Sequence, residues 1–89
     1  MITAVDVLVY TTDYCPYCDR AKALLDKRGI AYEEIDVTHD PEKRAWLVQT
    51  TRRRTVPQIF IKGEAIGGSD ELHALDRSGE LARKLAPQN

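Results

Sequence analysis

The two cysteines of this chain are separated by two residues, in the run Cys15-Pro16-Tyr17-Cys18. A pair at this spacing is typical of redox-active dithiols and also of metal sites. Two cysteines cannot build a framework of several disulfides, and a permanent bridge across so short a loop would add little stability. The motif therefore predicts thiol–disulfide chemistry or a pair of metal ligands, and the surrounding sequence has to decide between them.

The residues around the motif predict a strand, a turn and then a helix. Residues 5–10 are rich in β-branched side chains, and Thr11-Thr12-Asp13 is a cluster of turn and capping residues. We expect a helix to begin near Cys15, with Pro16 in its first turn, and to end at Gly29. This order is the one expected around a thioredoxin-like redox motif.

The predicted helix gives the two cysteines different roles. Unpaired N–H groups and the helix macrodipole stabilise negative charge at its first turn, where Cys15 lies. Sites of this kind lower the pKa of an attacking thiol to roughly 3.5–7.5. Cys18 lies one turn deeper, on an apolar stripe with Ala21, Leu24 and Leu25. We therefore expect Cys15 to attack a disulfide and Cys18 to resolve the product.

Metal binding is the alternative that the motif alone leaves open. A structural zinc site needs about four ligands, and the remaining candidates are His39 and His73. These histidines lie in distant segments without ligand-like spacing, and we expect both to face solvent. The sequence therefore favours redox chemistry and predicts no metal site.

The rest of the chain predicts an α/β domain that spans residues 1–89. A helix is expected from the cap Asp40 to about Thr50, with Trp46 and Leu47 on its buried side. A later helix is expected to begin at Ser69 or Asp70 and to end at Gly79. The other predicted elements are strands at 30–37 and 58–61, a hairpin turn at 62–64, a return strand from Ala65 and a last helical turn or two at 81–85. This order predicts a mixed sheet flanked by helices.

Composition and charge restrict the partners and the location. The formal net charge of −1 argues against nucleic acid as the main partner. No stretch approaches the roughly 18 apolar residues of a membrane span. The first residues, 1–6, lack a basic region, and an acidic residue interrupts their apolar run, so we expect no secretory signal. We therefore expect a cytoplasmic monomer that does not bind membranes.

Four blocks of the sequence resemble glutaredoxins of the dithiol C-P-Y-C type, and the resemblance extends over roughly residues 5–82. The blocks are the cysteine motif, residues 19–25, Thr55-Val56-Pro57-Gln58-Ile59-Phe60-Ile61 and Gly67-Gly68-Ser69-Asp70-Glu71-Leu72. The resemblance implies a thioredoxin-like fold with a four-stranded mixed sheet in the order βαβαββα, followed by a short helical extension. It also implies the reduction of protein–glutathione mixed disulfides and protein disulfides. Glutathione would be the cosubstrate, and no cofactor would be bound permanently.

The resemblance further implies a glutathione site beside Cys15. Its residues would be Tyr17, Gln49, Arg53, Thr55, Val56, Pro57, Gly68, Ser69 and Asp70. A cis bond between Val56 and Pro57 would turn the Val56 backbone toward the motif, where it could pair with a bound peptide. The helix that begins at Ser69 and Asp70 would receive the γ-glutamyl carboxylate, although these residues also fit simple capping.

The other end of glutathione has two sets of candidate partners in the sequence. One arginine of the run Arg52-Arg53-Arg54 is expected to meet the glycyl carboxylate, and Gln49 is a second candidate for the same contact. Tyr17 is expected to lie over the site, or else to be a half-exposed helix residue.

Three other functions fit parts of the sequence. A thioredoxin-reductase-fed electron donor would share the fold, and turnover with each reductant would separate it from a glutathione-dependent enzyme. A binding module would hold an iron–sulfur cluster between two chains and two glutathiones; Pro16 and Cys18 argue against it, as a colourless anaerobic preparation would. A structural module would keep its cysteines inert, and rapid alkylation of Cys15 would exclude it.

Overall fold

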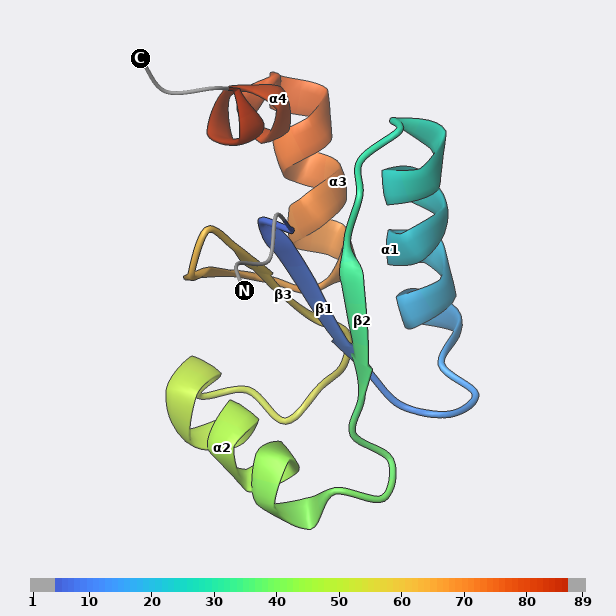
Figure 1. The fold of residues 1–89 in the computed structure, drawn as a ribbon, viewed down its shortest axis with the longest axis vertical. Helices are drawn as coiled ribbons and strands as arrows, with labels where there is room; N and C mark the ends of the chain where they lie inside the picture. Colours follow the sequence, from blue (N-terminus) through green and yellow to red (C-terminus); the bar gives the residue numbers. More distant parts are fainter. Residues whose placement is uncertain (1–4, 87–89) are drawn as a thin grey trace.

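Strand β1 (Val7–Thr11) lies in the middle of a four-stranded sheet with the strand order β2-β1-β3-β4. The computed structural model describes residues 5–86, and Figure 1 shows how they are arranged. β1 pairs in parallel with β2 (Glu33–Asp36) and antiparallel with β3 (Gln58–Ile61), which in turn pairs antiparallel with β4 (Glu64–Gly67). The sheet is therefore mixed, as the sequence predicts.

Four helices connect and follow these strands. α1 (Pro16–Lys27) joins β1 to β2, and α2 (Pro41–Thr51) lies between β2 and β3. α3 (Ser69–Ser78) and α4 (Glu80–Leu85) follow β4. Figure 1 shows α1 and α3 on one face of the sheet and α2 on the other. The start of α2 follows the sequence prediction, because the Asp40 carboxylate accepts a 3.0 Å hydrogen bond from the Lys43 N–H.

Two hydrophobic clusters hold the helices to the sheet. Successive side chains of a strand point to opposite faces. The larger cluster lies under α1, α3 and α4 and contains Val7, Val9, Ala21, Leu24, Leu25, Ile59, Ile61, Leu72 and Leu81. The smaller one lies on the α2 face and contains Tyr10, Val37, Leu47 and Phe60. The alternation along β1 and β3 therefore fixes α1 and α3 on one side and α2 on the other.

Three strands differ in their bounds from the sequence prediction, and one of them, β4, begins at Glu64 rather than Ala65. β1 begins at Val7 and ends at Thr11, whereas the sequence suggested 5–10. β2 covers only Glu33–Asp36 of the expected 30–37. This edge strand has a single partner, and its register aligns these four residues with residues 8–11 of β1. Its length is therefore set by its partner, which the sequence of β2 alone does not reveal.

The expected burial of α2 is confirmed at Leu47 and wrong at Trp46. Leu47 is 3% exposed, whereas Trp46 is 43% exposed. The Trp46 ring stacks on Phe60 with a centroid distance of 5.8 Å and lies 5.7 Å from the Tyr10 ring. Because consecutive helix residues are about 100° apart, Trp46 lies on the flank of α2. There it covers Phe60 with part of its surface and exposes the rest to solvent.

The strand order, the mixed pairing and the two helical layers are those of a thioredoxin-like fold. The short helical extension that the sequence predicts is α4. In residues 5–86, no helix has the length and apolar content needed to cross a membrane. The fold places the start of α1, the start of β3 and the start of α3 around the cysteine motif.

Candidate active site

Cys15 is the N-cap of α1, and Pro16 opens the helix. The Cys15 backbone is extended, and its sulfur accepts a hydrogen bond of 3.0 Å from the Cys18 N–H. Cys15 is half-buried, whereas Cys18 is 1% exposed and packs on the apolar face of α1. The two cysteines are joined by a disulfide with a Cα–Cα distance of 5.1 Å. The expected arrangement is confirmed, because the accessible sulfur lies at the helix N-terminus and its partner lies one turn deeper.

The loop before β3 borders this sulfur. The Val56–Pro57 peptide bond is cis, as the resemblance implied. The Cys15 sulfur lies 3.7 Å from the Val56 carbonyl oxygen. Gln58, which is buried, holds the loop by donating a 2.9 Å hydrogen bond from its Nε2 to the Thr55 carbonyl. This positioning role of Gln58 was not predicted, because a glutamine within a β-strand segment carries no sign of the loop it supports.

A groove of about 200 Å³ opens beside the loop. Its lining residues are Tyr17, Arg53, Thr55, Val56, Pro57, Gly68, Ser69, Asp70 and Glu71. They come from α1, from the segment that follows α2 and from the start of α3. The structure thus brings together eight of the nine residues named for a glutathione site, Gln49 being the exception.

α3 begins at Ser69, as the sequence predicts, but its cap is the residue before it. Gly68, rather than Ser69 or Asp70, is the N-cap, and its N–H donates a 2.8 Å hydrogen bond to the Glu71 carboxylate. A Cβ atom at position 68 would lie 3.2 Å from the Pro57 carbonyl oxygen, so this close approach favours glycine. The Glu71 carboxylate thus serves the Gly68 N–H, and the first-turn N–H groups of α3 donate no hydrogen bond to a cap side chain.

Glu71 also holds a groove arginine. An Arg53 guanidinium nitrogen lies 3.5 Å from a Glu71 carboxylate oxygen. The Gly68 N–H keeps the pKa of the Glu71 carboxyl below its ordinary value, and the charge of Arg53 acts in the same direction. Glu71 was not predicted as a lining residue, although an acid three positions after Gly68 is a recognisable capping signal.

This cap gives a first prediction. We expect Glu71→Ala to lower the free energy of unfolding at pH 7 by about 0.5–1 kcal/mol, because the Gly68 N–H loses its acceptor and the partly exposed Arg53 loses its partner. Glu71→Gln keeps an acceptor oxygen and is the matched control, with a smaller loss. Chemical denaturation of the three proteins provides the measurement.

The stabilisation by Glu71 also depends on pH with a definite sign. In the unfolded chain the Glu71 carboxyl has its ordinary pKa of 4.5, and in the folded chain its pKa is lower. The difference in the free energy of unfolding between the wild-type protein and Glu71→Ala is therefore complete above pH 4.5. It declines as the pH falls through the lower, folded-state pKa. A difference in stability that stays constant down to strongly acidic pH would contradict the role given to the carboxylate.

His73 is not the solvent-facing residue that the sequence suggested. It is half-buried one turn into α3, and its Nδ1 lies 2.8 Å from the Ser69 carbonyl oxygen, so that the ring donates this hydrogen bond. The Ser69 hydroxyl lies 3.4 Å from the same nitrogen. His73 therefore helps to fix Ser69, which is 3% exposed. His39 is exposed as expected.

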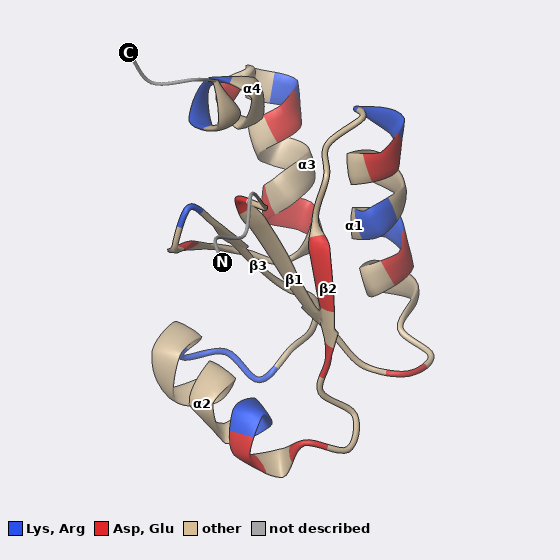
Figure 2. Cartoon of the chain, in the orientation of Figure 1, with Lys and Arg blue, Asp and Glu red and all other residues tan. Residues whose placement is uncertain are grey.

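The arginine run and Gln49 are now placed individually. Figure 2 shows this basic run on the segment that leaves α2. Arg53 lines the groove, Arg54 lines a pocket beside α2, and Arg52 ends α2 with a left-handed backbone. Gln49 is exposed and lines neither space. It lies two residues after the buried Leu47 and thus on nearly the opposite side of α2, so the structure does not bring it together with the groove residues.

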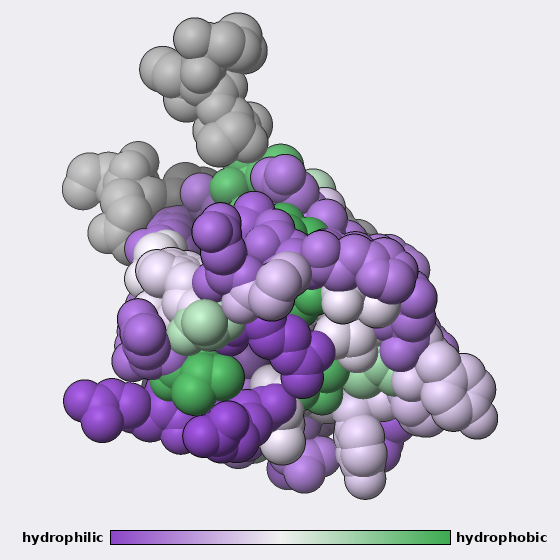
Figure 3. Space-filling view, turned by 90° about the horizontal axis from the view of Figure 1, so that it is seen from below, coloured by the Kyte–Doolittle hydropathy of each residue, from purple (hydrophilic) through white to green (hydrophobic). Residues whose placement is uncertain are grey.

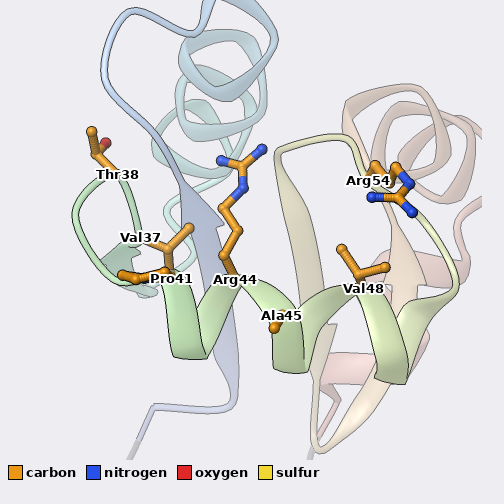
Figure 4. Close-up of a pocket in the computed structure, with 7 residues that line it drawn as sticks. All are labelled: Val37, Thr38, Pro41, Arg44, Ala45, Val48 and Arg54. Carbon is orange, nitrogen blue, oxygen red and sulfur yellow. The ribbon is translucent and has the colours of Figure 1, made fainter.

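A second pocket, of about 610 Å³, lies between α2 and the segments on either side of it. Figure 4 shows its lining residues Val37, Thr38, Pro41, Arg44, Ala45, Val48 and Arg54. The guanidinium groups of Arg44 and Arg54 extend to the same side of α2. The Thr38 hydroxyl accepts a 2.7 Å hydrogen bond from the Asp13 N–H in the loop that leads to Cys15. Two cations thus line a space that adjoins the cysteine loop.

The sequence and the fold both match known proteins. A family model described as Glutaredoxin matches residues 7–66. A glutaredoxin of Pseudomonas aeruginosa is 49% identical over 80 residues, which cover 90% of this chain and 95% of that protein. Glutaredoxin 3 of Escherichia coli is 46% identical over 76 residues, or 85% of this chain and 92% of that protein. The similarity therefore extends over nearly the full length of both relatives.

A solved structure supplies the same comparison in three dimensions. The crystal structure of a buckwheat glutaredoxin–glutathione complex aligns with a TM-score of 0.86 and 37% sequence identity. The alignment covers 90% of this chain and 76% of the buckwheat chain. The arrangement of elements around the cysteine motif is thus shared with a protein whose structure contains glutathione.

Proposed function

This chain belongs to the glutaredoxin family of thiol–disulfide oxidoreductases, and we propose that it uses glutathione to reduce protein–glutathione mixed disulfides and protein disulfides. The observation that carries the proposal is the position of Cys15. Its sulfur receives a backbone N–H at the start of α1 and lies beside the groove bordered by Val56 and Ser69. This position favours a thiolate and leaves room for a small thiol next to it.

The reaction starts from the reduced dithiol. The Cys15 thiolate attacks the glutathione sulfur of a mixed disulfide, forms a Cys15–glutathione disulfide and expels the protein thiolate, which takes up a proton. A second glutathione thiolate then attacks the glutathione sulfur of this adduct, releasing glutathione disulfide and the Cys15 thiolate. Alternatively, Cys18 attacks the Cys15 sulfur, and the Cys15–Cys18 disulfide forms as glutathione leaves.

We place the cysteinyl and γ-glutamyl parts of glutathione along the groove. Its backbone pairs with the Val56 backbone as an added strand would. The γ-glutamyl carboxylate lies at the N-terminus of α3, where the N–H groups of Ser69 and Asp70 have no partner within the helix. The Asp70 carboxylate is exposed and can accept a hydrogen bond from the glutathione amino group. Tyr17, which is 53% exposed, covers the groove beside Cys15.

The glycyl carboxylate has more than one candidate cation. Arg53 lines the groove but is paired with Glu71. Arg44 and Arg54 line the pocket on the α2 side, and no acidic residue lies among the seven that border it. The sequence analysis did not single out Arg44, because a lone arginine within a polar helix is usually a solvated residue. We propose that Arg44 and Arg54 supply positive charge to this end of glutathione.

A substitution tests this placement. We expect Arg44→Ala to raise the KM for glutathione about five-fold, the factor that corresponds to the roughly 1 kcal/mol of a partly exposed ion pair. Lys43→Ala removes a cation from the same turn of α2, and Lys43 lines neither the groove nor the Arg44 pocket. That control is expected to leave the KM unchanged. Equal effects of the two variants would assign the change to overall charge instead.

The experiment for the function as a whole compares two sources of electrons. The substrate is the mixed disulfide of glutathione and 2-mercaptoethanol. Turnover is measured with glutathione, glutathione reductase and NADPH, and separately with thioredoxin reductase and NADPH. The proposal predicts fast turnover with glutathione and little with thioredoxin reductase. The reverse order would favour a thioredoxin-reductase-fed electron donor.

We also propose the cellular setting that this chemistry suits. Residues 1–89 act as one domain and as a monomer, without a permanently bound cofactor, nucleic acid or membrane partner. Glutathionylated and disulfide-bearing proteins are its targets. A cytoplasmic location supports this role, because the reducing poise of that compartment keeps glutathione available.

A further inference from the structure

Tyr14, the residue immediately before Cys15, presents nearly all of its side chain to solvent. It is 97% exposed, compared with 53% for Tyr17 and 43% for Trp46. Its backbone is left-handed, with a φ of +50°, a conformation that is unfavourable for a bulky side chain. An aromatic ring thus stands in water at a position where asparagine or glycine would fit the backbone better. Neither packing nor local conformation accounts for tyrosine here.

The position of Tyr14 is fixed from both sides. The preceding residue, Asp13, donates its N–H to the Thr38 hydroxyl over 2.7 Å. The following residue, Cys15, is the N-cap of α1 and is tied to it through the Cys18 N–H. The ring is therefore carried on a backbone held at both ends, and its Cα lies about 3.8 Å from that of Cys15. A polypeptide joined to the Cys15 sulfur therefore passes close to the residue that carries this ring.

We propose that Tyr14 is a specificity residue that contacts the polypeptide of a protein disulfide while Cys15 is joined to it. The inference rests on the proposed function. The Cys15 thiolate attacks one sulfur of the protein disulfide, the new bond joins Cys15 to the target, and the other target cysteine leaves as a thiolate. Cys18 then attacks the Cys15 sulfur, the second target thiolate leaves, and two electrons have passed to the target. Tyr14 adjoins the target in the intermediate of this sequence.

The chemistry of the ring indicates which targets it favours. A tyrosine ring offers apolar area with little loss of conformational entropy, and it packs best on aliphatic or aromatic side chains. The end of the molecule that carries α2 and the loop before α1 is mostly hydrophilic, with small separate hydrophobic areas (Figure 3). Such a surface is better suited to contact with a short segment of a target protein than to a broad apolar interface. The preferred target therefore has an apolar residue beside its reactive cysteine.

Two synthetic peptides test this preference. Each contains one intramolecular disulfide, and they differ only in the residues next to the cysteines, leucine in one and serine in the other. Both are reduced by the wild-type protein, Tyr14→Phe and Tyr14→Asn, with glutathione and glutathione reductase. Tyr14→Phe keeps the ring, whereas Tyr14→Asn removes it and tolerates the left-handed backbone. The mixed disulfide of glutathione and 2-mercaptoethanol serves as the substrate without a polypeptide.

The inference predicts one pattern across the variants. The wild-type protein and Tyr14→Phe show a kcat/KM for the leucine peptide about five-fold above that for the serine peptide. Tyr14→Asn shows equal values for the two peptides and keeps the wild-type rate on the small mixed disulfide. A preference that survives in Tyr14→Asn overturns the inference, and so does an equal loss on all three substrates, which would mean that Tyr14 shapes the loop. If the wild-type protein fails on the small mixed disulfide, the proposed function itself is wrong.

Discussion

Replacing Cys15 by serine is expected to abolish reduction of every disulfide substrate, with a fall in rate of roughly three orders of magnitude or more. A serine hydroxyl is un-ionised at neutral pH and cannot form a disulfide, so the first step of the reaction is lost. Activity is measured with the glutathione-coupled assay on the small mixed disulfide and on a protein disulfide. Both substrates are expected to lose turnover together, because both react first with the same sulfur.

Cys15→Ser is expected to remove the reactive sulfur without disturbing the start of α1. The Cys15 sulfur accepts the cap hydrogen bond from the Cys18 N–H, and serine is among the best residues for that position in a helix. We therefore expect the reduced variant to unfold at the same denaturant concentration as the reduced wild-type protein, or a higher one. Appreciable turnover by a folded Cys15→Ser protein would mean that Cys18 is the nucleophile, and it would contradict the assignment to Cys15.

Replacing Cys18 is expected to separate the two activities. Cys18→Ser should retain most of its rate on protein–glutathione mixed disulfides, because a second glutathione can release Cys15. Its rate on protein disulfides should fall about 100-fold or more, because no resolving thiolate frees Cys15 from the target. The measurement is kcat/KM on the two substrate types for each variant.

Burial of Cys18 calls for a second variant at the same site. The residue is 1% exposed on the apolar side of α1, so a serine hydroxyl there costs about 1–3 kcal/mol if it finds no partner. Cys18→Ala avoids that cost and leaves only a small space. If both variants lose protein-disulfide reduction alone, the loss belongs to the sulfur. If Cys18→Ala reduces protein disulfides normally, the resolving role is wrong.

Local signals were sufficient for most of the helix boundaries. Pro16 after Cys15, Pro41 after Asp40, and Gly79 mark helix ends through effects that involve only a few neighbouring residues, and the structure places ends at all of them. The apolar stripe of α1 likewise identified Cys18 as the buried cysteine. These features follow from backbone geometry and side-chain chemistry within one element.

Other features depend on partners from elsewhere in the chain. β2 is shorter than its pattern because it pairs with only part of β1. The sequence predicted that Trp46 is buried, but it is Leu47 that lies on the face of α2 packed against the sheet. Glycine fits position 68, the cap of α3, because the Pro57 carbonyl approaches it closely. None of these contacts is encoded in the neighbouring residues, so local patterns cannot supply them.

In the candidate site too, some features follow from local sequence blocks and others depend on contacts from elsewhere in the chain. The groove residues in the Thr55-Val56-Pro57 and Gly68-Ser69-Asp70 blocks were identified through the family resemblance, and the fold brings them together. The choice among arginines was not accessible from sequence, because Arg53 and Arg54 are neighbours that line different spaces. Arg44 lies ten residues before Arg54 and shares a pocket with it only through the packing of α2.

The most direct test of the central claim is to locate the glutathione adduct. The Cys18→Ser protein is incubated with glutathione disulfide. The masses of the intact protein and of its peptides are then measured by mass spectrometry. The account predicts rapid formation of one adduct, on Cys15, which free glutathione then removes. A protein that forms no adduct, although its Cys15 is reduced and the chain is folded, would contradict the claim that glutathione exchanges with this sulfur.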